Sequence, residues 1–252
     1  MIFGSIRRYD GGMSPLREPV KACLFDVFGT VVDWRSSVSR DLAAFAKEKN
    51  LPPIDWLEFA MEWRKLYQPS MEEVRSGRRA WTILDVLHRE SLDQLVARYG
   101  LKALSEADLD YMNRAWHRLV PWPDVVQGLT RLKEKYIIAP CSNGNIALMV
   151  NLAKHSGLPW DVILGAETSG AYKPRPQAYL KSCEHLGLKP SQVLMVAAHN
   201  PDLKAAKAQG LHTAFVPRPN EYGPGQTTDL AADPACVDLA VRDFIELSER
   251  LS

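Results

Sequence analysis

The sequence has little that would direct the protein to a metal, a membrane or a nucleic acid. Its four cysteines form neither a CxxC pair nor a Cys/His spacing typical of zinc sites. No apolar run has the length of a membrane span, and the N-terminal stretch MIFGSIRRYDGG lacks the apolar segment of a signal peptide. The 31 basic and 30 acidic residues nearly cancel, so no global charge favours nucleic acid or anionic lipid. We therefore expect no nucleic-acid partner, no membrane association and a cytoplasmic location.

The chain also lacks the glycine-rich phosphate loops of nucleotide-binding proteins, since neither GxGxxG nor GxxxxGK occurs in it. We therefore expect no organic cofactor. At 252 residues, of which 46% are hydrophobic and 24% charged, the chain has the size and composition of one large or two modest globular domains. Residues 1–19, which contain a GG pair and precede the first strand-like run, are expected to form a flexible leader.

The hydrophobic pattern divides the rest of the chain into a helical insertion and an alternating part. Apolar residues recur at helical spacing through residues 35–119, with almost no strand signal. Short apolar runs alternate with helical stretches through residues 120–252, and one such run, KACLFDVF, precedes the insertion. Repeated strand–helix units form parallel sheets. We therefore predict an α/β fold, with a Rossmann-like parallel sheet core of residues 20–34 and 120–252 and an inserted helical cap domain at 35–119.

The carboxyl ends of the predicted strands carry the polar residues of most interest. After the first run, strands are predicted at residues 136–141, 161–166, 192–198, 212–216 and 237–241. Ligands of such sheets bind beyond the carboxyl ends of the strands, where the strand order reverses. Asp26, Ser142 and the segment that begins at His199 lie at such ends. We therefore expect them to meet in a cleft between the sheet and the cap.

Four short motifs occur in order at these positions: DVFGT, CSNGN, YKPRPQAY and VAAHNPDLKAA. Together they resemble the haloacid dehalogenase superfamily, and in detail its L-2-haloacid dehalogenase (type II) branch, over about residues 20 to 250. Variants with AAHN in the fourth motif include relatives associated with fluoroacetate hydrolysis. The resemblance implies the following catalytic residues: Asp26, Thr30, Lys173 and Asp202. It implies the following substrate and halide contacts: Phe28, Arg64, Tyr67, Ser142, Asn143 and Tyr179. His199 and Asn200 are further catalytic candidates, at the place where the sequence departs most from the best-known dehalogenases of the branch, many of which carry Ser-Ser-Asn where this chain has Ala197, Ala198 and His199.

Asp26 is the nucleophile that this resemblance implies, with Thr30 hydrogen-bonded near its carboxylate. A carboxylate can attack carbon or phosphorus and divide one hard displacement into two easier steps. The alternative is that Asp26 and Thr30 merely cap the turn at Gly29. Phosphatases of the superfamily usually carry a second Asp at the position of Phe28, which protonates the leaving alkoxide. A halide leaves without a proton, so an aromatic residue fits a dehalogenase, although Phe28 could also simply pack under the cap.

The fourth motif departs from the phosphatases of the superfamily in the same direction. Its positions Ala197 and Ala198 correspond to a Gly-Asp pair whose carboxylate binds magnesium in those enzymes. Magnesium needs hard oxygen ligands, usually including one or two carboxylates. We therefore expect no metal, and a magnesium-dependent phosphatase becomes the alternative function.

The second and third motifs supply groups for an anionic substrate. The resemblance implies that Ser142 binds the substrate carboxylate and that Asn143 faces the departing halide, whereas a simple turn or helix cap would use the same residues. Lys173 is expected to hold Asp26 ionised and to offset the substrate's charge, although a lone lysine is usually at the surface. Tyr179 is expected either to hydrogen-bond near this lysine or to be a core tyrosine.

The cap and the end of the fourth motif complete the predicted site. Arg64 is expected to receive the halide, and Tyr67 to line the cleft, with a solvated arginine and a cap-core tyrosine as the alternatives. Asp202 is expected to engage the lysine and the hydrolytic water. His199 could donate to the halide, help to activate water or be structural, and Asn200 could help to orient the water.

We therefore predict a hydrolase that converts short 2-haloalkanoic acids to 2-hydroxy acids through an ester of Asp26. Chloroacetate, L-2-halopropanoate and fluoroacetate are the candidate substrates, and the partner is a small-molecule haloacid. A homodimer is left open. Rival functions are the magnesium-dependent phosphatase, a phosphonate-type hydrolase, for which the cap offers no evident Schiff-base lysine, and a module of the same fold that binds without catalysis.

Overall fold

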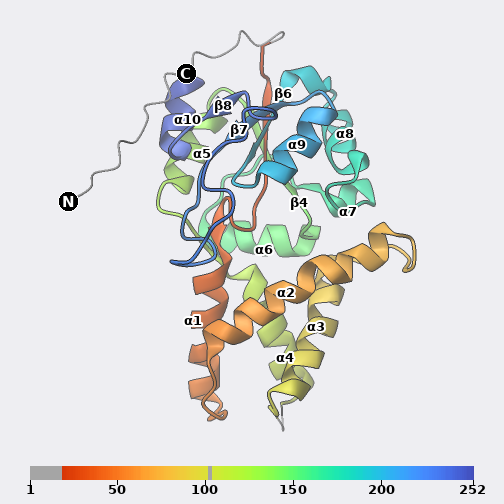
Figure 1. Cartoon of the computed structure of the whole chain (residues 1–252), viewed down its shortest axis with the longest axis vertical. Helices are drawn as coiled ribbons and strands as arrows, with labels where there is room; N and C mark the ends of the chain where they lie inside the picture. The colour runs from red at the N-terminus through yellow and green to blue at the C-terminus, as the bar shows by residue number, and fades with distance from the viewer. Residues whose placement is uncertain (1–18, 102–103) are drawn as a thin grey trace, which may run out of the picture.

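In the computed structural model, which describes residues 19–101 and 104–252, six parallel strands form the centre of one lobe (Figure 1). Most of the predicted leader, residues 1–18, lies outside the described residues. The strand order is β5 (Leu164–Gly165), β4 (Ile137–Ser142), β1 (Ala22–Phe25), β6 (Val193–Ala197), β7 (His212–Phe215) and β8 (Leu239–Ala240). The predicted parallel sheet is confirmed. The strand predicted at 161–166 is shorter than expected, because helix α7 (Ala166–Ser169) begins directly after Gly165.

Both faces of the sheet are covered, as the unbroken apolar character of β1 predicts. Cys23 and Phe25 point into a core with α5 (Val125–Lys133), α6 (Ile146–Ser156) and α10 (Phe244–Arg250). Ala22 and Leu24 point into a second core with α8 (Pro176–His185) and α9 (Asn200–Ala208), which follows the short 3-10 helix η2 (Pro190–Gln192) by way of β6. The four cysteines are buried free thiols, as expected for Cys23 and Cys141.

The helical insertion forms the second lobe in Figure 1. It consists of α1 (Trp34–Glu48), α2 (Trp56–Arg75), α3 (Leu84–Arg98), α4 (Glu106–Asn113) and the 3-10 helix η1 (Arg114–His117). Asp33 and Asp55 cap α1 and α2 by accepting hydrogen bonds from backbone N–H groups of the first turn. The inserted helical cap is thus confirmed. Within the described ranges, no helix combines the length and apolar character needed to cross a bilayer.

The cap joins the sheet lobe through two short strands that pair antiparallel, β2 (Val32–Asp33) and β3 (Val120–Pro121). The division of the chain at residues 34 and 120 stays a prediction. Strand β2 ends directly before the first of these positions, and β3 begins at the second. In the sheet, β4 and β5 lie on one side of β1, while β6, β7 and β8 lie on the other. The loops that follow β1, β4 and β6 therefore meet at one edge of the sheet, which faces the cap helix α2 (Figure 1).

Candidate active site

Asp26 follows β1 directly, and its carboxylate is held by three side chains. The Thr30 hydroxyl donates to Oδ2 over 2.6 Å, and the Lys173 ammonium donates to Oδ1 over 2.7 Å. The Nδ1 atom of His199 lies 3.1 Å from Oδ2. Burial alone would raise the pKa of Asp26, but Lys173 and His199 hold that pKa well below its ordinary value. The carboxylate is therefore ionised, and its partners are side chains rather than the backbone N–H groups of a capped turn.

The turn after Asp26 depends on a glycine and on a shared hydroxyl. Gly29 has a φ of +90°, and a Cβ atom at this position would lie 2.1 Å from Oε1 of Glu221. The hydroxyl of Thr30 accepts a hydrogen bond from the backbone N–H of Ala198 over 2.9 Å. Because that N–H occupies a lone pair of the hydroxyl oxygen, the hydroxyl proton is free to point at Asp26.

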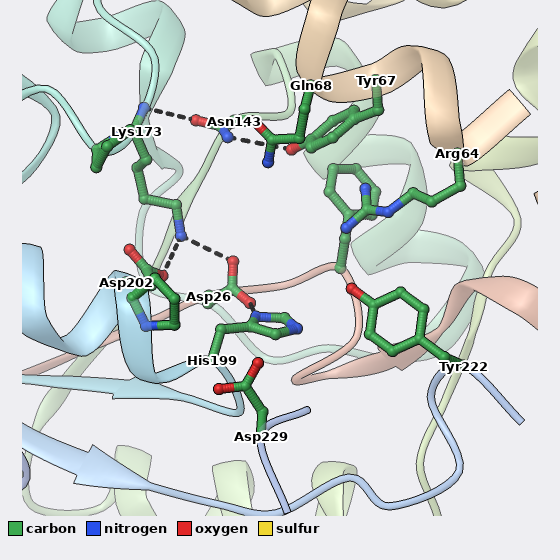
Figure 2. Close-up of a pocket in the computed structure, with 13 residues that line it drawn as sticks. Asp26, Arg64, Tyr67, Gln68, Asn143, Lys173, His199, Asp202, Tyr222 and Asp229 are labelled. Carbon is green, nitrogen blue, oxygen red and sulfur yellow. Dashed lines mark hydrogen bonds and ion pairs between the residues drawn. The ribbon is translucent and has the colours of Figure 1, made fainter. Parts of the chain in front are cut away.

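Lys173 connects Asp26 to a second carboxylate. Its ammonium group donates to Oδ2 of Asp202 over 2.5 Å as well as to Asp26, and Figure 2 shows it between the two carboxylates. Burial alone would lower the pKa of Lys173, but Asp202 and Asp26 raise it above its ordinary value. The residue is only 7% exposed, so it is not the surface lysine of the alternative interpretation.

Tyr179 reaches the same cluster from α8. Its hydroxyl donates to Oδ1 of Asp202 over 2.5 Å, and the residue is fully buried. It is therefore both a core tyrosine and a partner of the carboxylate that holds Lys173. Its side chain does not line the cavity next to Asp26.

The loop after β4 gives different positions to its two predicted site residues. Asn143 lines the cavity, where its side-chain amide donates to the Tyr67 hydroxyl over 3.1 Å and its Oδ1 accepts from the Lys173 backbone N–H over 2.8 Å. Ser142 is fully buried and does not line the cavity, and its Oγ accepts from the N–H of Gly144. The Ser142 hydroxyl thus caps the turn, as the alternative interpretation has it, and its contact with a substrate carboxylate stays a prediction.

Arg64 and Tyr67 project from α2 of the cap towards Asp26. The guanidinium carbon of Arg64 lies 4.1 Å from the ring centroid of Tyr67 and 5.9 Å from that of Phe28. Its Nη1 atom is buried without a hydrogen-bond partner. Burial alone would lower the pKa of Arg64, but the surrounding groups, which include Glu221 and Asp26, raise it. Arg64 is thus a half-buried cation whose buried Nη1 donor is free, rather than a fully solvated surface arginine.

Phe28 both lines the cavity and packs under the cap, so its two interpretations, as a pocket residue and as a packing residue, are compatible. Its ring meets Tyr67 edge to face at 6.3 Å and Trp116 at 5.8 Å. It brings no titratable group to the cavity.

His199 lies between two carboxylates. Its Nε2 atom is 2.8 Å from Oε2 of Glu221, and its Nδ1 atom faces Asp26. Burial alone would lower the pKa of His199, but Glu221 and Asp26 raise it to about 10. The ring is therefore an imidazolium at neutral pH, with both N–H groups engaged. Both ring nitrogens face carboxylates, and the roles of His199 towards water or a halide stay predictions.

Asn200 does not line the cavity. Its backbone and side-chain N–H groups donate to Oδ1 of Asp229, and its Oδ1 accepts from the Asp233 backbone N–H. It thus ties α9 to the loop after β7. Asp202, by contrast, lines the cavity as predicted.

The assembled residues enclose a cavity of about 400 Å³. Its lining also includes Gln68, Tyr222 and Asp229, which the sequence analysis did not identify (Figure 2). Glu221, whose Oε2 lies 2.8 Å from Nε2 of His199, was missed as well. Tyr222, Asp229 and Glu221 belong to the Pro/Gly-rich loop after β7, where no pattern of residues distinguishes them. Gln68 follows Tyr67 on α2 in an ordinary helical pattern.

Magnesium takes oxygen ligands, usually including one or two carboxylates, and two of the carboxylates in the cavity are already paired. Asp26 and Asp202 share the Lys173 ammonium, and Ala197 and Ala198 have no side-chain oxygen. Among the described residues, no group of three His, Cys, Asp or Glu side chains is placed to hold a metal ion.

The chain resembles known dehalogenases in sequence and structure. A protein-family model described as haloacid dehalogenase-like hydrolase matches residues 20–210. The crystal structure of a defluorinating L-2-haloacid dehalogenase is 46% identical, covers 95% of this chain and 98% of its own, and has a TM-score of 0.91. That of another L-2-haloacid dehalogenase is 50% identical, covers 92% of this chain and 100% of its own, and has a TM-score of 0.86.

Curated relatives give the same picture. (S)-2-haloacid dehalogenase 1 of Pseudomonas sp. (strain CBS-3) is 30% identical over 217 residues, which cover 81% of this chain and 89% of the relative. A phosphoglycolate phosphatase of Aquifex aeolicus (strain VF5) is a weaker match, 27% identical over 200 residues that cover 78% of this chain and 84% of the relative.

Proposed function

The chain belongs to the haloacid dehalogenase-like hydrolases, and we propose that it hydrolyses short 2-haloalkanoic acids to 2-hydroxy acids through an ester on Asp26. One observation carries the proposal. An ionised, buried Asp26 shares its cavity with Arg64, whose buried Nη1 lacks a partner, while Phe28 supplies no second carboxylate. Such a site has a nucleophile and an anion acceptor, but it lacks the carboxylic acid two residues after the nucleophile that protonates the leaving alkoxide in phosphatases of the superfamily.

The first step is a displacement at carbon by Oδ1 of Asp26. This oxygen accepts one hydrogen bond, from Lys173, whereas Oδ2 has both Thr30 and His199 beside it. Oδ1 therefore keeps more lone-pair density for attack. Its electron pair forms a bond to C2 of the substrate, and the carbon–halogen pair leaves with the halide. Lys173 and the enclosing cap keep the carboxylate oriented and away from bulk water.

The halide leaves towards the cap in this mechanism. Arg64 offers an unpartnered N–H there, held over the rings of Tyr67 and Phe28. A preorganised cation at the place where negative charge develops stabilises the transition state without reorganisation. The halide leaves without a proton, so the reaction needs no acid at position 28.

Hydrolysis of the ester completes the reaction. Water attacks Cγ of Asp26 and passes a proton to Asp202, which lines the cavity next to Lys173. The bond from Cγ to Oδ1 then breaks, and the product alkoxide takes that proton and leaves as a hydroxy acid. The second proton of the water is released when Asp26 returns to its carboxylate form, so one proton and one halide are produced for each haloacid consumed.

The direct test is halide release from chloroacetate, L-2-chloropropanoate and fluoroacetate, with a generic phosphate ester as a parallel substrate, all in EDTA. We expect halide release that chelation leaves unchanged and that Asp26→Asn abolishes. Fluoroacetate belongs in the set because one solved neighbour is a defluorinating enzyme. No halide from any haloacid, together with phosphate release that magnesium restores, would replace this proposal by the alternative.

That alternative, a magnesium-dependent phosphatase, is supported by the weaker similarity to a phosphoglycolate phosphatase. Phe28 and Ala198 argue against it, because neither supplies the carboxylate that the phosphatases of the superfamily carry at that position. The cytoplasmic location and the homodimer remain predictions, which fractionation of cells and the mass of the protein in solution would test.

A further inference from the structure

Glu221 is a buried carboxylate that neither step described above uses. It is 1% exposed and comes from the loop after β7. One of its oxygens accepts from the Trp34 indole N–H over 3.0 Å, and the other lies 2.8 Å from Nε2 of His199. A buried carboxylate is costly unless it is paired, and here its ionic partner is the histidine that contacts the nucleophile.

We propose that Glu221 is a positioning residue that holds His199 as a charged donor on Oδ2 of Asp26, where the ring stabilises the oxyanion formed when the Asp26 ester is hydrolysed. This inference rests on the proposed function, because it concerns the second step of that reaction. His199 is then a catalytic residue, since its N–H contacts a reacting atom.

The assignment of the two carboxylate oxygens makes Oδ2 the site of the oxyanion. Because Oδ1 attacks the substrate, Oδ2 becomes the carbonyl oxygen of the ester. When the lone pair of water bonds to Cγ, the carbonyl π pair moves onto Oδ2. The Thr30 hydroxyl and the His199 N–H already lie 2.6 and 3.1 Å from this atom. The pair returns to re-form the carbonyl as the bond to Oδ1 breaks, so both donors stabilise a charge that exists only during hydrolysis.

Glu221 matters most while the ester is present. In the free enzyme the imidazolium lies between two anions, Asp26 and Glu221 (Figure 2 shows the Asp26 side). Esterification removes the charge of Asp26, so Glu221 becomes the remaining carboxylate in contact with the ring. Without Glu221, the low solvent exposure of His199 would favour the neutral imidazole. The single remaining ring proton could then be on either nitrogen, so Nδ1 would not always carry it. Asp26 and Glu221 contact the ring, and the other charged and titratable groups that line the same cavity are Arg64, Tyr67, Lys173, Asp202, Tyr222 and Asp229.

The surroundings of Glu221 fix its position. The Trp34 indole, at the start of the cap, orients one carboxylate oxygen. Gly29, in the turn after Asp26, leaves the space that the carboxylate occupies, because a Cβ atom there would lie 2.1 Å from Oε1. The glycine in the turn after Asp26 therefore leaves room for the Glu221 carboxylate.

Glu221→Gln tests the charge while nearly preserving the shape, since the amide oxygen can still accept from His199. In single-turnover and steady-state assays with chloroacetate, we expect the first equivalent of halide to appear at close to the wild-type rate. The ester on Asp26 should then accumulate, detected as added mass, and kcat should fall by about 10²-fold. The alkaline limb of the kcat profile should move to lower pH, because the ring loses its proton more readily. Glu184→Gln, an equal charge change on an exposed helix position, should leave all of these unchanged.

The possible outcomes separate this inference from the proposed function. If wild-type protein releases no halide, the function fails and the inference falls with it. If wild type is active but Glu221→Gln slows the first halide release as much as turnover, or leaves the pH profile in place, only the role of Glu221 is overturned.

A second measurement does not depend on the folding of Glu221→Gln. In Asp26→Asn the nucleophile is neutral, as it is in the ester. Nitrogen-15 spectra of His199 in this variant should show both ring nitrogens protonated well above the ordinary histidine pKa of about 6.5. A ring that is neutral near that pH would overturn the proposal.

Discussion

Replacing Lys173 by methionine removes one charge from between two buried carboxylates. The ammonium group contacts both Asp26 and Asp202, and the side chains of all three residues are about one-tenth exposed or less, at 8, 11 and 11%. Breaking a buried pair by removing one partner costs about 3 to 5 kcal/mol, because the remaining charge is left uncompensated. We expect Lys173→Met to lower the free energy of unfolding by that amount at neutral pH. Halide release should fall at the same time, because Asp26 is then less ionised and less well oriented.

The loss should depend on pH in a defined direction. The pKa of Asp26 is lowered in the folded protein, so its contribution to stability is present above the ordinary carboxyl pKa of about 3.9 and is lost as the pH falls through the lowered value. In Lys173→Met, Asp26 loses the cation that contributes most to lowering its pKa, so it takes up a proton at a higher pH than in the wild type. The difference between the two proteins should therefore be largest near neutral pH and shrink as the pH falls towards 4.

Urea unfolding at about pH 7 and pH 4.5 measures this difference. The matched control is Lys207→Met, which removes a lysine that pairs with Asp238 and whose side chain is 38% exposed. An exposed pair contributes about 0 to 1 kcal/mol, so this variant should lose little at either pH. The reasoning is refuted if the two variants lose the same amount, or if the loss in Lys173→Met is equal at both values of pH.

Three further predictions concern the residues around Asp26. Arg64→Gln should lower kcat by about 10²-fold or more, because the leaving halide loses its cation; a normal rate in a halide-release assay would remove Arg64 from the halide path. Gly29→Ala should destabilise the protein by about 1 to 3 kcal/mol, because its φ of +90° is strained for alanine and the new Cβ meets Glu221; an unchanged melting temperature would contradict this. His199, whose pKa is raised to about 10, should contribute stability that is complete below about pH 6.5 and lost as the pH rises through 10. Urea unfolding at about pH 6.5 and pH 10 should show a smaller loss of stability with rising pH in Glu221→Gln than in the wild type. An equal loss in the two proteins would count against the ion pair.

The central part of the site could be predicted because it follows from strand ends. Parallel strands place their carboxyl ends at one edge, so Asp26, Ser142 and the segment after β6 were expected to lie near one another. The four motifs then identified Lys173 in a loop that strand positions alone would not single out. The cap was predictable as a block of helices, and Arg64 as its best candidate, because the helical period and the motif agreed.

What the sequence could not decide was mostly side-chain direction. Ser142 suits either a turn or a carboxylate site, and the backbone after β4 turns its hydroxyl to Gly144. Asn200 follows the same strand as His199, yet α9 directs it to Asp229. Glu221 lies 22 residues from His199 in a long loop without a periodic pattern, so no spacing rule connects the two. Such pairings depend on how a loop folds back over the sheet, which local propensity does not encode.

The charges of the cavity explain why the loop after β1 carries Asp26 but no second aspartate at position 28. Lys173 lies between Asp26 and Asp202, and the His199 ring lies between Asp26 and Glu221, so both cations are already paired. Arg64 forms no ion pair with a carboxylate among the described residues, and its Nη1 has no partner. Its guanidinium carbon lies 5.9 Å from the ring centroid of Phe28. An aspartate at position 28, as in phosphatases of the superfamily, would bring a buried carboxylate beside this cation and pair with it. Phenylalanine there does more than omit an acid, because it leaves the Arg64 guanidinium unpaired and so available to the halide of the proposed reaction.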